Sequence, residues 1–394
     1  MMSAKDARRL LLGGQGLLDD PGRRATTRAV LRTIESLGFV QVDSINVVER
    51  AHHLTLHSRL DGYGREQLSR LAEVDRSVFE HWTHDASLVP TRWFAHWKPR
   101  FARDRVRLRA NAWWKRLLGK DADRTLAATL ARITEEGPLR SQDFEHPSKR
   151  KAWWDWKPAK AALDFLWRTG DLMVPGREGF QKIYDLTERV LPAHHALPVP
   201  EREAHVDWAC SAAAARLGVF TASELVRFWN AVQADEARAW CGAKARAGEI
   251  VPVLVASEGA MAPQKAFAVA DWESRVARLP DAPDRTRLLG PFDPVVRDRS
   301  RCLRRFGFDY RFEAFVPEPK RTYGYFVMPI LERDRIVGRA DLKVHRARSS
   351  LEVKGLWWEA GVRATKERRR MLEEGLGRLA AFVGATRIEG LLSS

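Results

Sequence analysis

The sequence has few of the residues and runs that mark several protein classes. Its 394 residues include only three cysteines, Cys210, Cys241 and Cys302. They lie too far apart for a disulfide framework or a zinc site, which is typical of a reducing cytoplasm. No apolar run approaches the roughly 20 residues that cross a bilayer, and the first residues lack the apolar stretch of a signal peptide. We therefore expect a cytoplasmic protein without a membrane anchor.

Acidic residues are scarce relative to basic ones. Lys and Arg number 67 against 51 Asp and Glu, which gives a formal net charge of +16. This excess predicts a polyanionic partner, most often nucleic acid, although a generally Arg-rich proteome would give the same balance. Between Thr91 and Lys120, ten Lys or Arg accompany a single acid, Asp104, with four tryptophans interleaved. We interpret this segment as a DNA-facing surface, with a solvated helix face as the alternative.

The hydrophobic pattern predicts an α+β fold with three tandem winged-helix units followed by a C-terminal antiparallel β-barrel-like domain. The clearest unit has three helices and then a β-hairpin, which is the order of a winged helix. Its helices are expected at 126–136, after a turn at 137–144, and at 156–169, and its strands at 170–174 and 179–184. The expected domain boundaries are 1–120, 121–195, 196–282 and 283–394.

The first and third units and the C-terminal domain rest on the same kinds of pattern. An apolar stripe predicts a helix from Thr27 to Leu37, and Ser3 followed by Asp6 predicts the start of an earlier one. Two further helices of the first unit are expected, around 47–60 and at 65–74. In the third unit, helices are expected at 204–217, 221–230 and 235–246, with a strand at 249–255. Alternating residues predict C-terminal strands at 308–316, 323–331, 335–344 and 350–358, and a closing helix at 365–382.

A polar pair follows the helix predicted at 27–37. Gln41 and Asp43 lie two residues apart, so in an extended segment they share one face with Phe39, while Val40 and Val42 point to the other. Such a pair presents an amide and a carboxylate side by side. On its own, the triplet is typical of strand ends and turns.

Several long segments resemble a family of winged-helix DNA glycosylases that act on alkylated guanines and interstrand crosslinks. The Gln-hydrophobe-Asp pattern matches the YcaQ-like (AlkX) branch rather than the AlkZ branch, which carries Gln-hydrophobe-Gln. The likeness covers nearly the whole chain, and it implies tandem winged helices in a C shape. The matching segments are 45–60, 143–147, 153–158, 291–296, 319–326 and 338–346.

The resemblance implies a monofunctional glycosylase of base excision repair. An N7-alkylated guanine is already cationic and leaves as a neutral base, so one carboxylate is enough where ordinary glycosidases need two. Asp43 then stabilises the oxocarbenium-like sugar and orients or activates water, and Gln41 positions the water or the sugar. No lysine lies beside the pair in sequence to favour a Schiff-base lyase.

The resemblance also implies a partner, double-stranded DNA carrying alkylated or crosslinked guanine, bound by a monomer at the bacterial nucleoid. His53, Ser58 and Arg59 neighbour the catalytic stretch, while Lys320 and Arg321 are placed at the tip of a predicted hairpin that probes the minor groove. A tight turn with two solvated charges is the alternative for this hairpin. The expected DNA-binding residues are His53, Ser58, Arg59, Lys157, Lys320, Arg321 and Arg339.

Three other interpretations compete with this one. His53 and His57 have the i, i+4 spacing of zinc ligands, but no HExxH pattern or cysteine accompanies them, so we expect neither metal nor cofactor. A non-enzymatic winged-helix regulator explains the charge and the helices but leaves Gln41 and Asp43 unexplained. A metal-dependent nuclease would need an acidic cluster that the sequence lacks.

Overall fold

A computed structural model describes the chain apart from residues 20–21, 23–24, 145–155, 260 and 391–394 and the side chains of Trp156 and Lys157. The chain folds as two compact units. The first unit comprises Met1–Gln67 and Ala209–Ser394, and the second comprises Leu68–Trp208. The two units are described separately below. The expected division into four domains stays a prediction.

The first unit opens with two helices that the sequence predicts. α1 (Ala4–Gly14) begins where the Ser3 side chain accepts a hydrogen bond from the Asp6 backbone N–H, and α2 (Thr27–Leu37) buries its apolar stripe. α2 ends at Gly38, which has φ +92°. A Cβ at this position would lie 2.8 Å from the Trp229 ring, so glycine allows the chain to turn into β1 (Val40–Gln41).

The chain then forms short helices where longer ones are expected. The helix predicted around 47–60 is shorter, α3 (Ala51–His57), and the one predicted at 65–74 is formed by α4 (Arg65–Ser69) and a π-helical turn at Arg70–Val74. Residues 42–50 have no regular secondary structure. Of the two catalytic candidates, Gln41 therefore ends β1, and Asp43 lies on the irregular segment between β1 and α3.

The segment around residues 202–282 alternates helices and strands in the predicted order. Its three strands pair antiparallel in the order β7-β9-β8. The three helices and the strand expected here are confirmed within a few residues, whereas the winged-helix assignment stays a prediction. The elements are α11 (Arg202–Leu217), β7 (Val219–Phe220), α12 (Ala222–Trp229), α13 (Ala234–Arg246), β8 (Ile250–Val255), β9 (Gln264–Val269) and α14 (Trp272–Arg278).

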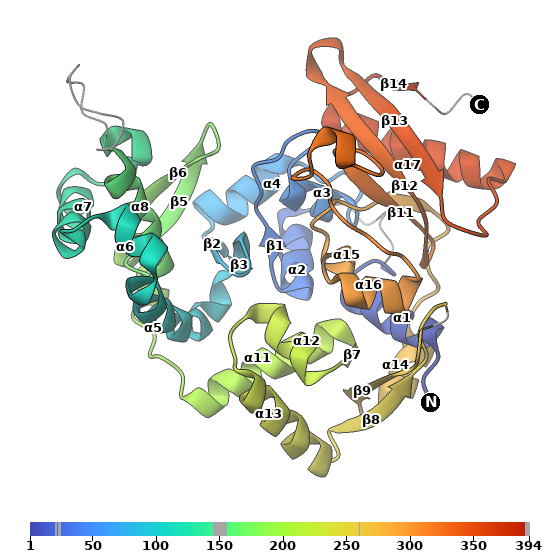
Figure 1. Cartoon of the computed structure of the whole chain (residues 1–394), viewed down its shortest axis with the longest axis horizontal. Coiled ribbons are helices and arrows are strands. Elements are labelled where there is room, and N and C mark those ends of the chain that lie inside the picture. Colours follow the sequence, from blue (N-terminus) through green and yellow to red (C-terminus); the bar gives the residue numbers. More distant parts are fainter. Residues whose placement is uncertain (20–21, 23–24, 145–155, 260, 391–394) are drawn as a thin grey trace. The chain divides into compact units, whose positions relative to one another are not determined.

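A five-stranded curled sheet closes the first unit, in the order β10-β11-β12-β13-β14 (Figure 1). Its strands pair antiparallel except β14, which runs parallel to β13, so the expected all-antiparallel arrangement is wrong at this edge. The predicted closing helix is confirmed as α17 (Lys366–Val383), whose Leu372, Leu376 and Leu379 join the core of the sheet. The strands are β10 (Thr286–Leu288), β11 (Val327–Glu332), β12 (Arg335–His345), β13 (Ser350–Trp358) and β14 (Arg387–Gly390).

The strand predicted at 308–316 is wrong. After α15 (Pro294–Arg297) and α16 (Arg299–Phe306), residues 308–326 form a loop with one 3-10 turn, Glu318–Lys320. The Glu313 carboxylate accepts hydrogen bonds from the backbone N–H groups of Thr322, Tyr323 and Gly324. These bonds satisfy the N–H groups of residues 322–324, which would otherwise pair with a neighbouring strand. Residues 308–316 therefore form part of a loop held by the Glu313 side chain, although their sequence alternates.

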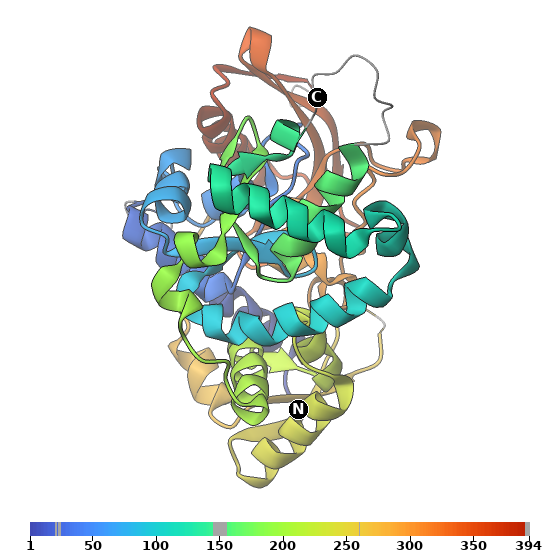
Figure 2. The ribbon, with the colours of Figure 1, turned by 90° about the vertical axis from the view of Figure 1, so that its left-hand side faces the viewer.

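The second unit is mainly helical, and Figure 2 shows its long helices in teal and green. The expected helices at 126–136 and 156–169 and the following hairpin are confirmed, with strand order β4-β6-β5. The helix expected after residue 144 falls on 145–155, outside the described residues. The elements are β2 (Val78–Trp82), β3 (Ala86–Pro90), α5 (Phe94–Ala110), α6 (Ala112–Leu118), α7 (Ala122–Glu136), β4 (Leu139–Arg140), α8 (Trp156–Arg168), β5 (Leu172–Glu178), β6 (Gln181–Leu186), α9 (Thr187–Val190) and α10 (Pro192–His195).

The tryptophans of the basic segment 91–120 do not line a surface as a group. Trp93, Trp97 and Trp114 are buried, and the Trp97 indole donates to His81 Nδ1 at 3.1 Å. Trp113 alone among the four is exposed over half of its surface. Aromatic side chains in this segment therefore serve mainly as core, whereas most of its basic residues, apart from buried Arg100, are exposed or half-buried. The DNA-facing role of the segment stays a prediction.

Two further observations concern the cysteines and possible membrane-spanning helices. All three cysteines are buried free thiols, as their spacing predicts. Across the described residues, no helix combines the length and the apolar character that crossing a bilayer requires.

Candidate active site

Phe39 fixes the start of the segment that carries Gln41 and Asp43. Its ring is buried against Phe228 and Trp229 of α12, with centroid distances of 5.9 and 5.8 Å. The Arg297 guanidinium lies over the Phe39 ring, 5.0 Å from its centroid. Phe39 thus attaches the segment to the helices of the first unit.

The other end of the segment is attached to the C-terminal sheet. The Val47 carbonyl accepts a hydrogen bond from the Val344 N–H of β12 at 3.1 Å. Arg346 donates to the Asn46 carbonyl at 3.1 Å, to Asn46 Oδ1 at 2.7 Å and to the Val48 carbonyl at 3.2 Å. Val48 is fully buried in the core of the sheet. Residues 40–46 therefore run between two fixed points that are far apart in sequence.

Gln41 and Asp43 alternate with a buried residue, as expected for an extended segment. Both side chains are half-buried, and Val42 between them is 7% exposed. Phe39 departs from the predicted pattern, because it is buried at 3% exposure rather than sharing the face of Gln41 and Asp43. Its large apolar ring gains more from the aromatic cluster of α12 than from a polar face.

The Asp43 carboxylate is oriented by its own backbone. Its Oδ1 accepts a hydrogen bond from the Ile45 N–H at 2.7 Å. This contact is an Asx turn, which fixes the direction of the side chain and ends the strand at Gln41. A local hydrogen bond thus orients the carboxylate relative to its own backbone. The contacts at Phe39 and at residues 46–48 fix the position of that backbone.

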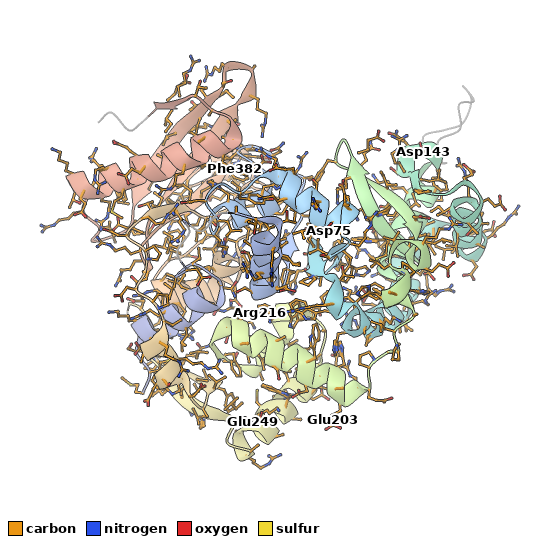
Figure 3. The ribbon with its side chains drawn as sticks, turned by 180° about the vertical axis from the view of Figure 1, so that it is seen from behind. Asp75, Asp143, Glu203, Arg216, Glu249 and Phe382 are labelled. Atoms are coloured by element: carbon orange, nitrogen blue, oxygen red, sulfur yellow. The ribbon has the colours of Figure 1, made fainter. Side chains whose placement is uncertain are left out.

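The histidines of α3 pack against aromatic rings. His53 Nδ1 lies 2.8 Å from the Tyr63 hydroxyl, and His57 stacks on Phe382, which is labelled in Figure 3, at a centroid distance of 4.3 Å. Burial lowers the pKa of His53 and of His57 to about 4, because it disfavours the imidazolium form. Within the described ranges, no group of three or more His, Cys, Asp or Glu could hold a metal ion.

Arg59 and Ser58 are internal residues rather than surface contacts. Arg59 is 2% exposed, and its guanidinium binds both oxygens of Asp293, at 2.5 and 3.0 Å. Its Nη1 also donates to the hydroxyl of Ser58, which is 6% exposed. The guanidinium is thus paired with an internal carboxylate and shielded from solvent in this structure, and the DNA-contacting role expected for these two residues stays a prediction.

Arg339 is also internal. It is 4% exposed, donates to Glu359 Oε1 at 2.7 and 3.0 Å, and lies 4.2 Å from the ring centroids of both Phe308 and Tyr323. These contacts hold the loop 308–326 against β12, and the expected DNA contact of Arg339 stays a prediction. Lys157 is the second residue of α8, and its side chain lies outside the described part of the structure.

Lys320 and Arg321 lie on the loop 308–326 rather than on a hairpin tip. Lys320 is exposed, and half-buried Arg321 donates from Nε to the Val316 carbonyl at 2.9 Å. The Arg321 guanidinium also lies 4.8 Å from the Tyr325 ring centroid. In Figure 2 this loop stands out from the sheet of the first unit as an orange segment with a short helical turn. Two basic side chains are thus presented on a loop whose backbone Glu313 holds.

Sequence patterns miss two residues that support the segment. Glu49, 5% exposed, accepts hydrogen bonds from the Arg50 N–H and from Arg65 Nε, both at 2.8 Å. Burial opposes its charge, yet these bonds hold the pKa of Glu49 below its ordinary value. Arg346 belongs to a matching segment but is not singled out there. No local signal connects it to Asn46, which is 300 residues away.

Comparison with known proteins identifies the class of protein to which this chain belongs. A family model described as DNA glycosylase AlkZ-like matches residues 34–382. The match spans Gln41, Asp43, Glu49 and Arg346, and it covers well over half of the chain. The protein is therefore a DNA repair enzyme, a DNA glycosylase. It belongs to the AlkZ-like DNA glycosylase family, which confirms the resemblance inferred from sequence.

The fold is similar to a solved structure, the DNA glycosylase AlkZ of Streptomyces sahachiroi. The two chains share 18% sequence identity with a TM-score of 0.67, over 99% of this chain and 100% of that one. At this identity, the likeness shows a common fold. The α+β class is confirmed, together with a curled sheet at the C-terminal end.

Proposed function

We propose that this DNA glycosylase hydrolyses the N-glycosidic bond of N7-alkylguanine in duplex DNA and unhooks interstrand crosslinks at the same base. The observation that carries the proposal is the attachment of Gln41 and Asp43 between two fixed points, with Asp43 aimed by an Asx turn. Catalysis by electrostatic stabilisation requires such preorganisation, because a charge that must move to meet the transition state gains little.

In the proposed reaction, the cationic base leaves as a neutral molecule and the bond to the sugar breaks with both electrons going to the base. The sugar becomes oxocarbenium-like, and the Asp43 carboxylate stabilises its positive charge. Water attacks the anomeric carbon, and Asp43 orients it or accepts its proton. Gln41 holds the water or the sugar through an amide that both donates and accepts.

DNA is held by charge in this proposal. The exposed Lys320 and the loop that carries it approach the groove beside the lesion, and the basic residues of 91–120 supply phosphate contacts. His53 stays near the segment as a neutral hydrogen-bonding group, since its pKa is lowered to about 4. A crosslinked guanine is tethered to the opposite strand, so the enzyme works on the duplex surface rather than flipping the base freely.

We further propose that the enzyme acts as a monomer in the bacterial cytoplasm and joins the nucleoid when bound to DNA. Three buried free thiols support a reducing compartment. The catalytic scheme needs neither metal nor cofactor. The family of the chain is enzymatic, which argues against the alternative of a non-enzymatic regulator.

Single-turnover excision tests the proposal. A duplex with one N7-methylguanine and a second duplex with an interstrand crosslink through N7 of guanine are each incubated with excess enzyme and then heated to cleave abasic sites. Strand cleavage at the modified guanine, absent from an unmodified duplex of the same sequence, is expected. Cleavage at N7-methylguanine no greater than in an enzyme-free sample treated in the same way would overturn the assignment of the substrate.

A further inference from the structure

The second unit contains a cavity of about 630 Å³ that the proposed reaction does not use. Helices α6 and α8, strand β6 and the turn before α8 line it. Its volume lies within the range of about 300–1,000 Å³ that is usual for small-molecule sites. Trp113, Lys160 and Gln181 on its lining are exposed, so a ligand can enter from solvent. The lining residues are Trp113, Trp114, Leu117, Ser141, Lys160, Ala161, Asp164, Gln181, Lys182 and Tyr184.

Aromatic rings form the walls of this cavity. Trp113 is 51% exposed and meets Trp114 edge to face, with centroids 5.2 Å apart and an interplanar angle of 88°. Trp114 is 5% exposed and is supported from behind by Phe165 at 5.9 Å. Tyr184, 8% exposed, lines the cavity from β6. A half-exposed indole on a fixed neighbour offers a flat face on which a planar ring can stack.

Positive charge gathers at the same place. The Lys182 ammonium lies 3.1 Å from the Trp167 ring centroid and 3.6 Å from Glu80 Oε1, and Arg177 binds the same carboxylate. Lys160, exposed on α8, adds a further cation to the lining. With Arg168, which binds Asp164, four cations accompany the two carboxylates of Glu80 and Asp164, so the group has a positive excess.

The one carboxylate on the lining itself is Asp164. Its Oδ2 accepts a hydrogen bond from Arg168 Nε at 3.1 Å, so its charge is balanced within α8. Carboxylate, hydroxyl and amide groups of Asp164, Ser141 and Gln181 give the lining both donors and acceptors. This set matches the hydrogen-bonding edge of a base, while the excess cations match a phosphate.

We propose that this cavity is a binding site for a nucleotide, whose base stacks on Trp113 and whose phosphate is held by Lys160 and Lys182. The stacking of a base on an exposed aromatic ring beside basic side chains is the usual device of single-strand binding, and it accepts any base. Two sources supply this chemistry, a free mononucleotide or an unpaired nucleotide of single-stranded DNA. The inference does not rest on the proposed reaction, since Asp43 belongs to the first unit.

Calorimetric titration of the full chain tests this site. The ligands are thymidine, thymidine 5′-monophosphate and a short oligodeoxythymidine. Saturable binding of the monophosphate and the oligonucleotide is expected. Trp113→Ala should weaken both by about tenfold or more, because the stacking of one base on an aromatic ring is typically worth that factor. Lys160→Ala should weaken the monophosphate but not thymidine, whereas Lys160→Arg should restore binding.

Val106→Ala is the matched control, because Val106 is 73% exposed in the same unit and does not line the cavity. It should bind like the wild type, and unchanged thermal unfolding of each variant shows that the fold is intact. Tighter binding of the oligonucleotide assigns the site to single-stranded DNA, and equal affinity assigns it to the free nucleotide. No saturable binding at millimolar ligand, or wild-type binding by Trp113→Ala, would overturn the proposal.

Discussion

Arg59 and Asp293 are 234 residues apart in sequence and form a buried ion pair with two hydrogen bonds. Their side chains are 1% and 0% exposed. Asp293 also accepts a hydrogen bond from the Val295 N–H and so caps α15. The pair ties the chain just after α3 to the chain that leads from the C-terminal sheet into α15 and α16. It therefore stabilises the surroundings of the candidate site.

Asp293→Asn should destabilise the first unit strongly. The amide keeps the shape but leaves the Arg59 charge buried without a counter-charge, and breaking a buried pair in this way costs about 3–5 kcal/mol. Asp284→Asn is the control, because Asp284 pairs with Arg333 at the surface, where the two side chains are 67% and 50% exposed. A surface pair contributes about 0–1 kcal/mol. Equal decreases in the free energy of unfolding of the two variants in urea would show that the buried pair has no special role.

Half-buried His57 should make stability fall in acid. Its pKa is about 4 in the folded chain against 6.5 for an exposed histidine. Between these values, the unfolded chain binds the extra proton, so the free energy of unfolding falls as the pH drops. The slope for one proton is at most about 1.4 kcal/mol per pH unit. His57→Asn should flatten the profile between pH 6.5 and 4 relative to the wild type, as measured by urea unfolding at each pH. An unchanged slope would mean that His57 titrates normally.

Lys320 and Arg321 should contribute to DNA binding. Replacing both with Ala removes two cations, so the slope of log affinity against log salt should become shallower by about 0.9 for each phosphate that is no longer neutralised. Excision should slow as well. The control variant, Lys5→Ala with Lys366→Ala, removes the same charge from exposed positions on α1 and α17. If both double variants bind and excise alike, the loop makes no specific interaction with DNA.

The reaction should continue in a metal chelator. The leaving base is neutral and the carboxylate supplies the only charge that the scheme needs, so EDTA should leave single-turnover excision unchanged. The assay compares enzyme dialysed against EDTA with enzyme supplied with zinc or magnesium. Activity that disappears on chelation and returns with either ion would revive a metal role for His53 and its neighbours.

Local rules explain how much of this protein can be predicted from sequence. The apolar stripe of α2, the cap at Ser3 and the alternation around Val42 depend on neighbours within four residues, and they are predicted correctly. The contacts that hold the site in place have no such signal. Arg346 meets Asn46 across 300 residues, so only the folded chain shows that the segment is fixed at this end.

Carboxylates make contacts that sequence patterns do not predict. An alternating pattern predicts a strand at 308–316, but Glu313 accepts hydrogen bonds from the backbone donors of 322–324 in place of a strand ladder. The resemblance implies DNA contacts for Arg59 and Arg339, and in the structure buried Asp293 binds the first and half-buried Glu359 binds the second. In each case the carboxylate is distant in sequence or on the same loop as the groups that it binds.

Asp43→Asn tests the central claim most directly. The substitution keeps the shape and the hydrogen bond to the Ile45 N–H but removes the negative charge. Single-turnover excision of N7-methylguanine should slow by about 10²–10³, while duplex binding at fixed salt stays at the wild-type level. Gln41→Ala should cost less, because it only positions water or sugar. Excision by Asp43→Asn at the wild-type rate, with DNA binding intact, would contradict the account and place the catalytic carboxylate elsewhere.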